Sequence, residues 1–367
     1  MEWFVLLIPF VFSIVGLRFF GHEIHKLELI APIVISIIFI LIFKVSSVSY
    51  STSDTEFWGG KIVQAQHYEP WDEWIEETCS YDCCCDTEGN NCSTIYYDCS
   101  YVRYHSEAWY LVDENGFKRG ISQREYRRLV SSFTNEAFKD MNRDYHHNDG
   151  DMYFTNWNNQ YTTIENVVTK HSYVNRPQAT KNLFYYEDLD ENEVKGLYEY
   201  PPIIDYKQQH LLGINNPSVD RELDRINGLL AKTKQLKLFV LVYDSPSDDV
   251  SYKQEAYWKG GNKNEFILTL GVQNNKILWS RVISWTENQY SKINAEKLFM
   301  ANTDASKLKE TVHKLIPILK NDFERKQFKD FDYIKVPLNN TQTLWLYISA
   351  VVINFLVMLG VVKNGIK

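Results

Sequence analysis

Three carboxylates close to the end of an apolar run are the residues best placed to do chemistry. Asp244, Asp248 and Asp249 follow residues 237–243, which read Lys-Leu-Phe-Val-Leu-Val-Tyr. A continuous apolar run predicts a strand buried on both faces, and α/β sheets bind ligands at the carboxyl ends of such strands. The three side chains are therefore candidate ligands of calcium or magnesium, which prefer oxygen donors. A solvated turn explains the same residues equally well.

The six cysteines form one cluster, which indicates either a disulfide framework or a metal site. They are Cys79, Cys83, Cys84, Cys85, Cys92 and Cys99. Neighbouring cysteines fit disulfide geometry poorly, so residues 83–85 are expected to pair with the other three. Thiolates together with His67 or His105 would suit zinc, although no Cys-x-x-Cys pair is present. Disulfides are the favoured prediction, metal ligands and free thiols the alternatives, and the connectivity stays open.

Other motifs for catalysis are weak or missing. Residues 144–151 read Asp-Tyr-His-His-Asn-Asp-Gly-Asp, an oxygen-rich loop that suits calcium but departs from the EF-hand spacing. A polar turn explains this loop as well, and His146-His147 fit a surface position. The sequence contains no phosphate-binding glycine loop, HExxH or GxSxG motif. The chain therefore has no strong catalytic signature.

The first part of the polar region is predicted to mix strands with one helix. Aromatic and β-branched residues predict strands at 57–68 and 100–112. Residues 113–116, Asp-Glu-Asn-Gly, predict a turn into a further strand at 117–120. Residues 122–125, Ser-Gln-Arg-Glu, have the pattern of a capping box at the start of a helix. The cysteine cluster is then an insertion between the two main strands.

The last part of the polar region predicts a layered α/β sheet with the element order β-α-β-β-α. Asn216-Pro217 places a cap and a first-turn proline before a helix that reaches about Lys234. After the buried strand, the patterns predict a short helix, a hairpin and an amphipathic helix, at 252–258, 266–272 with 277–285, and 304–320. Residues 333–336 are a candidate edge strand.

Within this part, one stretch resembles a known family. The matching residues are Leu238–Tyr243 ending in Asp244, Ala256, Trp258, Gly260-Gly261, residues 265–272 and residues 276–285. Over about residues 235–320 the chain resembles the TPM-domain family of exported, membrane-tethered proteins. The resemblance implies a small α/β sandwich, and either phosphatase activity or a role in building or repairing membrane complexes. Residues 284–288, Ser-Trp-Thr-Glu-Asn, depart from the family's later glycine-rich segment.

Three apolar segments bracket the polar region, at 3–17, 27–48 and 343–362. Each approaches the ~20 residues that a membrane-spanning helix needs. We therefore expect a transmembrane hairpin at 1–48 and a carboxyl-terminal transmembrane helix at 343–363. Asn354, the strongly polar side chain of the last segment, is expected to bond to a neighbouring helix or to a second copy.

The positive-inside rule predicts the orientation of these spans. Residues 18–26 and the tail 363–367 are both basic and lie on the same face when the chain crosses three times. This face is predicted to be cytoplasmic, so the aromatic, Cys-rich region 49–216 and the TPM-like domain 217–336 lie outside. A cleaved signal peptide is the competing interpretation of the first segment, but Arg18 and the bulky residues after it offer no small-residue cleavage site.

Composition limits the partners. The net charge of −8 disfavours nucleic acid, because cationic side chains supply most of that affinity. Aromatic residues reach 15%, which suits contact surfaces or simply a β-rich fold. We expect a multi-pass, non-enzymatic membrane protein that binds lipid and other membrane or envelope proteins, or a second copy, within a membrane complex. The alternative is a metal-dependent phosphatase in which Asp244, Asp248 and Asp249 hold the metal.

Overall fold

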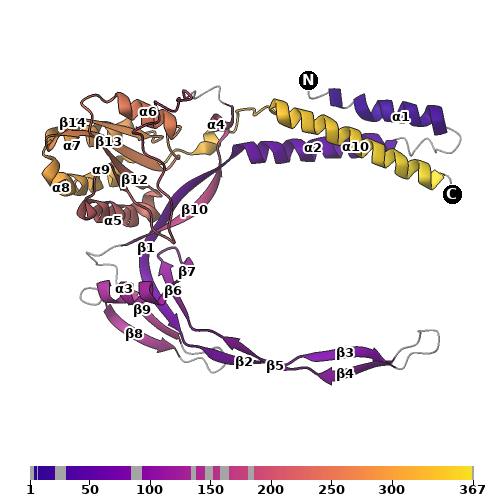
Figure 1. Cartoon of the computed structure of the whole chain (residues 1–367), viewed down its shortest axis with the longest axis horizontal. Helices are drawn as coiled ribbons and strands as arrows, with labels where there is room; N and C mark the ends of the chain where they lie inside the picture. Colours follow the sequence, from indigo (N-terminus) through magenta and orange to yellow (C-terminus); the bar gives the residue numbers. More distant parts are fainter. Residues whose placement is uncertain are drawn as a thin grey trace. The chain divides into compact units, whose positions relative to one another are not determined.

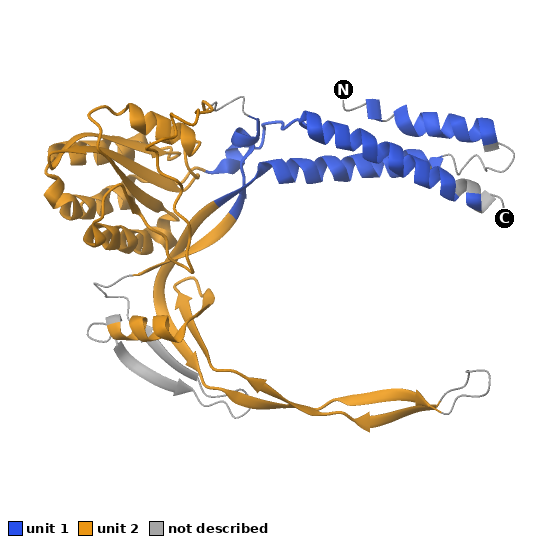
Figure 2. Ribbon diagram, in the orientation of Figure 1, with its two compact units in different colours: residues 1–55, 172–185, 327–367 blue, residues 56–171, 186–326 orange. Residues whose placement is uncertain are grey.

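The chain folds into two compact units, which are described separately. The computed structural model describes residues 4–5, 7–20, 30–83, 93–133, 138–144, 152–157, 165–180 and 186–365. The smaller unit comprises residues 1–55, 172–185 and 327–367, and the larger unit comprises residues 56–171 and 186–326 (Figure 2). The larger unit thus contains most of both segments expected as separate domains, 49–216 and 217–336.

The smaller unit contains three apolar helices, α1 (Leu7–Phe20), α2 (Ile30–Thr52) and α10 (Asn340–Gly365). Apolar stretches in α2 (Pro32–Thr52) and in α10 (Asn340–Gly360) are long and apolar enough to cross a membrane. The third predicted span differs, because α1 has only 14 residues. Two helices of spanning length are therefore present among the described residues.

Polar side chains join these helices to one another. Asn354 of α10 donates from Nδ2 to Oγ of Ser36 in α2 across 2.7 Å, and both residues are buried. Near the other end of α10, Gln342 donates to Oγ of Ser51 across 2.8 Å. The prediction that Asn354 bonds to a neighbouring helix is confirmed, with α2 as that neighbour.

The smaller unit also contains short segments outside its three apolar helices, and hydrogen bonds hold these segments together. Strand β1 (Ser53–Tyr68) follows α2 without a linker, and α4 (Arg176–Thr180) follows strand β10 (Asn166–Val174). Asn175 donates to the carbonyl of Thr52 and to the carboxylate of Asp54. A 3-10 helix, η3 (Phe328–Phe331), precedes α10. Residues 333–336 form no strand here, so that prediction was wrong: the N–H of Ile334 closes a turn onto the carbonyl of Phe331.

A six-stranded sheet forms the first part of the larger unit. Its order is β7-β6-β1-β9-β8, and β10 also pairs with β1 (Figure 1). The further strands are β6 (Ala108–Asp113), β7 (Lys118–Ile121), β8 (Phe138–Asp144) and β9 (Met152–Trp157). Helix α3 (Gln123–Phe133) begins as predicted, since Ser122 Oγ accepts from the N–H of Glu125. Leu129 of α3 is buried in a core with Ile62 and Leu111.

A long two-stranded arm occupies the place predicted for the cysteine insertion. Strands β2 (Trp71–Ile75) and β5 (Tyr101–His105) pair, and so do β3 (Thr78–Cys83) and β4 (Ser93–Asp98), as Figure 1 shows. The predicted strand 100–112 is thus divided between β5 and β6. We call residues 71–83 and 93–105 the arm.

A four-stranded sheet, ordered β11-β12-β13-β14, forms the rest of the larger unit. The strands are β11 (Leu211–Leu212), β12 (Lys237–Tyr243), β13 (Glu265–Gln273) and β14 (Lys276–Ser284). Strands β12 and β13 are parallel, whereas β13 and β14 form the predicted hairpin. Its turn residues Asn274 and Asn275 both have positive φ, as a tight hairpin turn requires.

Helices cover this sheet, and we call the sheet and its helices the α/β layer. The helices are α5 (Pro217–Lys234), α6 (Asp249–Tyr257), α7 (Gln289–Ala301), α8 (Leu308–His313) and α9 (Leu315–Asp322). All seven residues of β12 are buried, as the apolar run predicted. Leu238, Val240 and Val242 share a core with α5, α7, α8 and α9. Phe239, Leu241 and Tyr243 belong to a second core on the other face.

Candidate functional site

The acidic loop lies where the sequence placed it, but its carboxylates do not converge. Asp244 directly follows β12 and accepts a hydrogen bond from Gln273 across 3.0 Å. Asp248 precedes α6, and Asp249 is its first residue. Among the described residues, the metal-binding atoms of three side chains come within 4.8 Å of one another only at Glu77, Cys79 and Cys99. The calcium or magnesium site therefore stays a prediction, as does the loop 145–151 with His146-His147, which lies outside the described residues.

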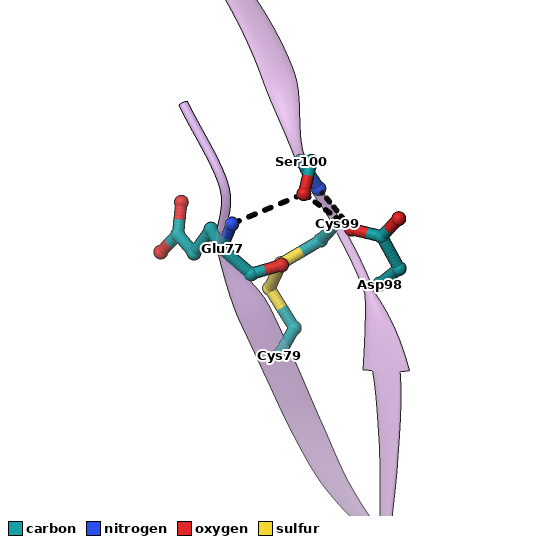
Figure 3. Close-up of a disulfide and its surroundings, with 5 residues drawn as sticks. All are labelled: Glu77, Cys79, Asp98, Cys99 and Ser100. Carbon is teal, nitrogen blue, oxygen red and sulfur yellow. Dashed lines mark hydrogen bonds between the residues drawn. A yellow bond between two sulfur atoms is a disulfide. The ribbon is translucent and has the colours of Figure 1, made fainter. Parts of the chain in front are cut away.

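The structure pairs two of the six cysteines. Cys79 and Cys99 form a disulfide with their Cα atoms 5.8 Å apart (Figure 3). Both had been expected to pair within 83–85. The register explains the difference: Cys79 lies opposite Tyr97, so Cys99 is its diagonal neighbour across the ribbon and within disulfide reach. Cys83 ends β3, and Cys84, Cys85 and Cys92 lie outside the described residues.

The disulfide lies at a break between the two halves of the arm, where side chains replace ladder hydrogen bonds. Cys99 donates its N–H to the carbonyl of Glu77, but the N–H of Glu77 donates to Oγ of Ser100 across 3.1 Å (Figure 3). Ser100 also donates its own N–H and hydroxyl to Asp98. These bonds stabilise the carboxylate and lower the pKa of Asp98. The disulfide and this network hold both halves of the arm in one register.

The outer half of the arm, which consists of strands β3 and β4, has an apolar face. Because side chains alternate along a strand, Tyr81, Ile95 and Tyr97 share the face of the disulfide. Their exposed fractions are 53%, 42% and 49%. The opposite face carries mostly Ser, Thr and Asp side chains. In a folded antiparallel ribbon, such alternation marks a face that is normally covered.

The inner half of the arm, which consists of strands β2 and β5, also exposes apolar side chains. Trp74 lies directly opposite Val102, and both are mostly exposed. On the other face, the rings of Trp71 and His105 stack, and His105 bonds to Glu73. A two-stranded ribbon is marginally stable alone, and each half of the arm pairs only two strands in the described structure. Its large side chains are thus available for contact.

A buried group of titratable residues in the α/β layer was not foreseen. Lys237, the first residue of β12, donates from Nζ to Nε2 of His210 across 2.8 Å, and both are buried. Burial lowers the pKa of Lys237 and, together with that lysine, lowers the pKa of His210. Burial also raises the pKa of Asp224 and of Glu265, which accepts from the hydroxyl of Tyr200. The lysine at the head of an apolar run was the only sequence signal.

This buried group serves the fold better than chemistry. Lys237 and His210 are 1% and 0% exposed, so a substrate cannot reach either base. A cleft of about 940 Å³ runs beside Asp224, and two of the arginines that line it are paired with glutamates. Arg128 forms a double hydrogen bond with Glu165, and Arg225 bonds to Glu222 in the same way. We interpret both as internal contacts of the larger unit.

Comparisons with known proteins add no relative. No protein family, no curated protein and no solved structure matches the chain. The arm, the helices of membrane-spanning length and the acidic loop are thus the features from which a function can be inferred.

Proposed function

We propose that this chain is an integral membrane protein that acts without catalysis, as a binding component of a membrane complex. The arm is its binding element. The observation that carries this proposal is the exposed set of aromatic and aliphatic side chains on a ribbon that, in the part of the chain the structure describes, pairs only two strands. Large exposed apolar patches mark contact sites, and Tyr and Trp dominate the energy of many interfaces.

The anchor and the orientation complete the proposal. Helices α2 and α10 would cross the membrane, with lipid against their exposed apolar side chains. The disulfide favours an oxidising compartment for the arm, and the basic residues 18–26 and 363–367 favour a cytoplasmic position for those segments. The α/β layer would be the TPM-like domain, since its β-α-β-β order and its two apolar cores suit that resemblance.

Photo-crosslinking from the arm tests the proposal. A photoreactive phenylalanine analogue replaces Ile95 on the apolar face of the arm, and in a matched control it replaces Ile293 of α7; both side chains are 42% exposed. In native membranes, we expect an adduct of defined mass from position 95 and none from position 293. Equal adducts from both positions, or none from the arm, would refute a binding role for it.

The acidic loop supports the second candidate, a metal-dependent phosphatase. Asp244 ends a buried strand that runs parallel to β13, and ligands bind at that edge of α/β sheets. The purified full chain would be assayed on a generic phosphate ester with magnesium or calcium. Turnover that Asp248→Ala abolishes and Asp188→Ala leaves intact would replace the non-enzymatic proposal.

A further inference from the structure

The segment that contains the arm carries most of the net charge of the chain. Residues 71–105 contain eight acidic side chains and one arginine, whereas the whole chain has a net charge of −8. The acidic residues are Asp72, Glu73, Glu76, Glu77, Asp82, Asp86, Glu88 and Asp98. The rest of the chain is therefore close to neutral, and six of the eight carboxylates belong to the arm.

Most of this charge is not neutralised within the arm. Among the described residues of the arm, Glu73 is the one carboxylate with cationic neighbours, Arg103 at 4.0 Å and His105 at 2.7 Å. Asp82 accepts from the hydroxyl of Thr94, and Asp98 accepts from Ser100. These neutral donors hold the carboxylates in place but leave their charge available.

The negative charge and the apolar face of the arm together indicate which kind of partner binds it. A second copy would bring the same negative charge against the arm, and anionic lipid headgroups would repel it in the same way. A basic protein surface complements it, because opposite potentials steer association and like charges across an interface are costly. Tyr81, Ile95 and Tyr97 project from one face of the ribbon, and Asp82 and Asp98 project from the other.

We propose that the arm docks into a basic groove of a partner protein. Tyr81, Ile95, Tyr97 and the disulfide pack against an apolar wall of that groove, and carboxylates on the opposite face of the arm pair with Lys and Arg side chains of the other wall. This inference rests on the proposed binding function. The Cys79–Cys99 disulfide holds the ribbon in its bound register before contact, and this reduces the conformational entropy that is lost on association.

Three variants that retain the photoreactive group at position 95 test the inference in native membranes. Asp82→Lys with Asp98→Lys reverses the charge at the outer half of the arm. Tyr81→Ser with Tyr97→Ser removes the apolar face. Asp188→Lys with Glu191→Lys makes the same charge change at exposed positions outside the arm. Mass spectrometry identifies the crosslinked peptide, and thiol alkylation confirms that Cys79 and Cys99 remain oxidised.

We expect a crosslinked partner peptide rich in Lys and Arg. Its yield should fall at least about tenfold in the arm charge reversal and stay unchanged in the control reversal. The yield should also fall as salt rises from about 0.05 to about 0.5 M, because the Debye length shortens roughly threefold.

The other outcomes separate this inference from the proposed function. An adduct lost only in the tyrosine variant, with no response to charge or salt, keeps the binding function and overturns the basic partner. An adduct with a second copy or with lipid also overturns the inference. If no adduct forms from the arm, both the proposed binding function and the basic partner are refuted.

Discussion

The α/β layer and the arm stabilise their strands in opposite ways. Every residue of β12 is buried between two apolar cores, whereas every residue of β4 is exposed. The layer therefore draws its stability from burial, and the arm from ladder hydrogen bonds and the Cys79–Cys99 disulfide. An element stabilised covalently leaves its aromatic side chains available for a partner, and this is the physical basis of the proposed function.

The largest expected effect is the loss of a buried ring in the layer. Phe266 of β13 is fully buried, and its ring packs edge-on against Phe323. Phe266→Ala should lower the free energy of unfolding by about 3–5 kcal/mol, because a cavity replaces the ring. Thermal unfolding of the purified chain measures this. A cost below ~1 kcal/mol would contradict the view that burial stabilises the layer.

Removal of the Cys79–Cys99 disulfide should have the next largest effect on stability, and this effect should be confined to the arm. The disulfide closes a loop with a sequence separation of 20, and Cys79→Ser should destabilise the arm by about 3 kcal/mol. Limited proteolysis should then cut within residues 71–105 much faster, while the unfolding temperature of the α/β layer stays constant. Ser80→Ala is the matched control. Unfolding of the layer in the Cys79 variant would show that the two regions are coupled.

The buried lysine should give the layer a pH dependence that the arm lacks. Burial lowers the pKa of Lys237 to about 7 in the folded chain, although the charges of Asp224 and Glu265 act to raise it. The pKa is ~10.4 when the chain is unfolded. Between these values the unfolded chain binds more protons, so stability should rise with pH, by at most ~1.4 kcal/mol per unit.

Unfolding measured from pH 7 to 10 checks this dependence. Lys237→Met should reduce the slope, and Lys276→Met, a change at an exposed lysine, should keep it. An unchanged slope in Lys237→Met would show that this amine does not titrate in that range.

The smallest expected effect on stability is at the apolar face of the arm. Tyr97 is 49% exposed, so Tyr97→Ala should change the unfolding free energy by less than ~0.5 kcal/mol. Thermal unfolding and limited proteolysis measure this change side by side. A loss above ~2 kcal/mol would mean that this face stabilises the arm itself and is not reserved for a partner.

Local signals predicted much of the α/β layer. Asn216 caps α5 by accepting from the N–H groups of Ser218 and Val219, as the Asn-Pro pair indicated. The helix predicted at 304–320 is divided into a 3-10 turn, α8 and α9. Pro317 explains the division between α8 and α9, since proline lacks the N–H of a helix interior and clashes with the preceding turn. This signal was present in the sequence and was overlooked.

Helix α7 was not predicted, because its buried face is built from small residues. Ser291, Ala295 and Phe299 are buried at helical spacing, but only the last is strongly apolar. The helix packs beside β14, where Glu296 accepts from the N–H of Val282 across 2.8 Å. A polar side chain that covers a sheet edge has no periodic signature.

The sequence by itself determined the apolar helices, the buried strand β12, the caps at Ser122 and Asn216, and the acidic, cysteine-rich character of the arm. These features depend on composition and on spacing along the chain. Only the tertiary structure decided that Cys79 pairs with Cys99, that Asn354 bonds to Ser36, and that Lys237 lies buried against His210. Each depends on strand register or helix packing, which bring together residues that are distant in the sequence.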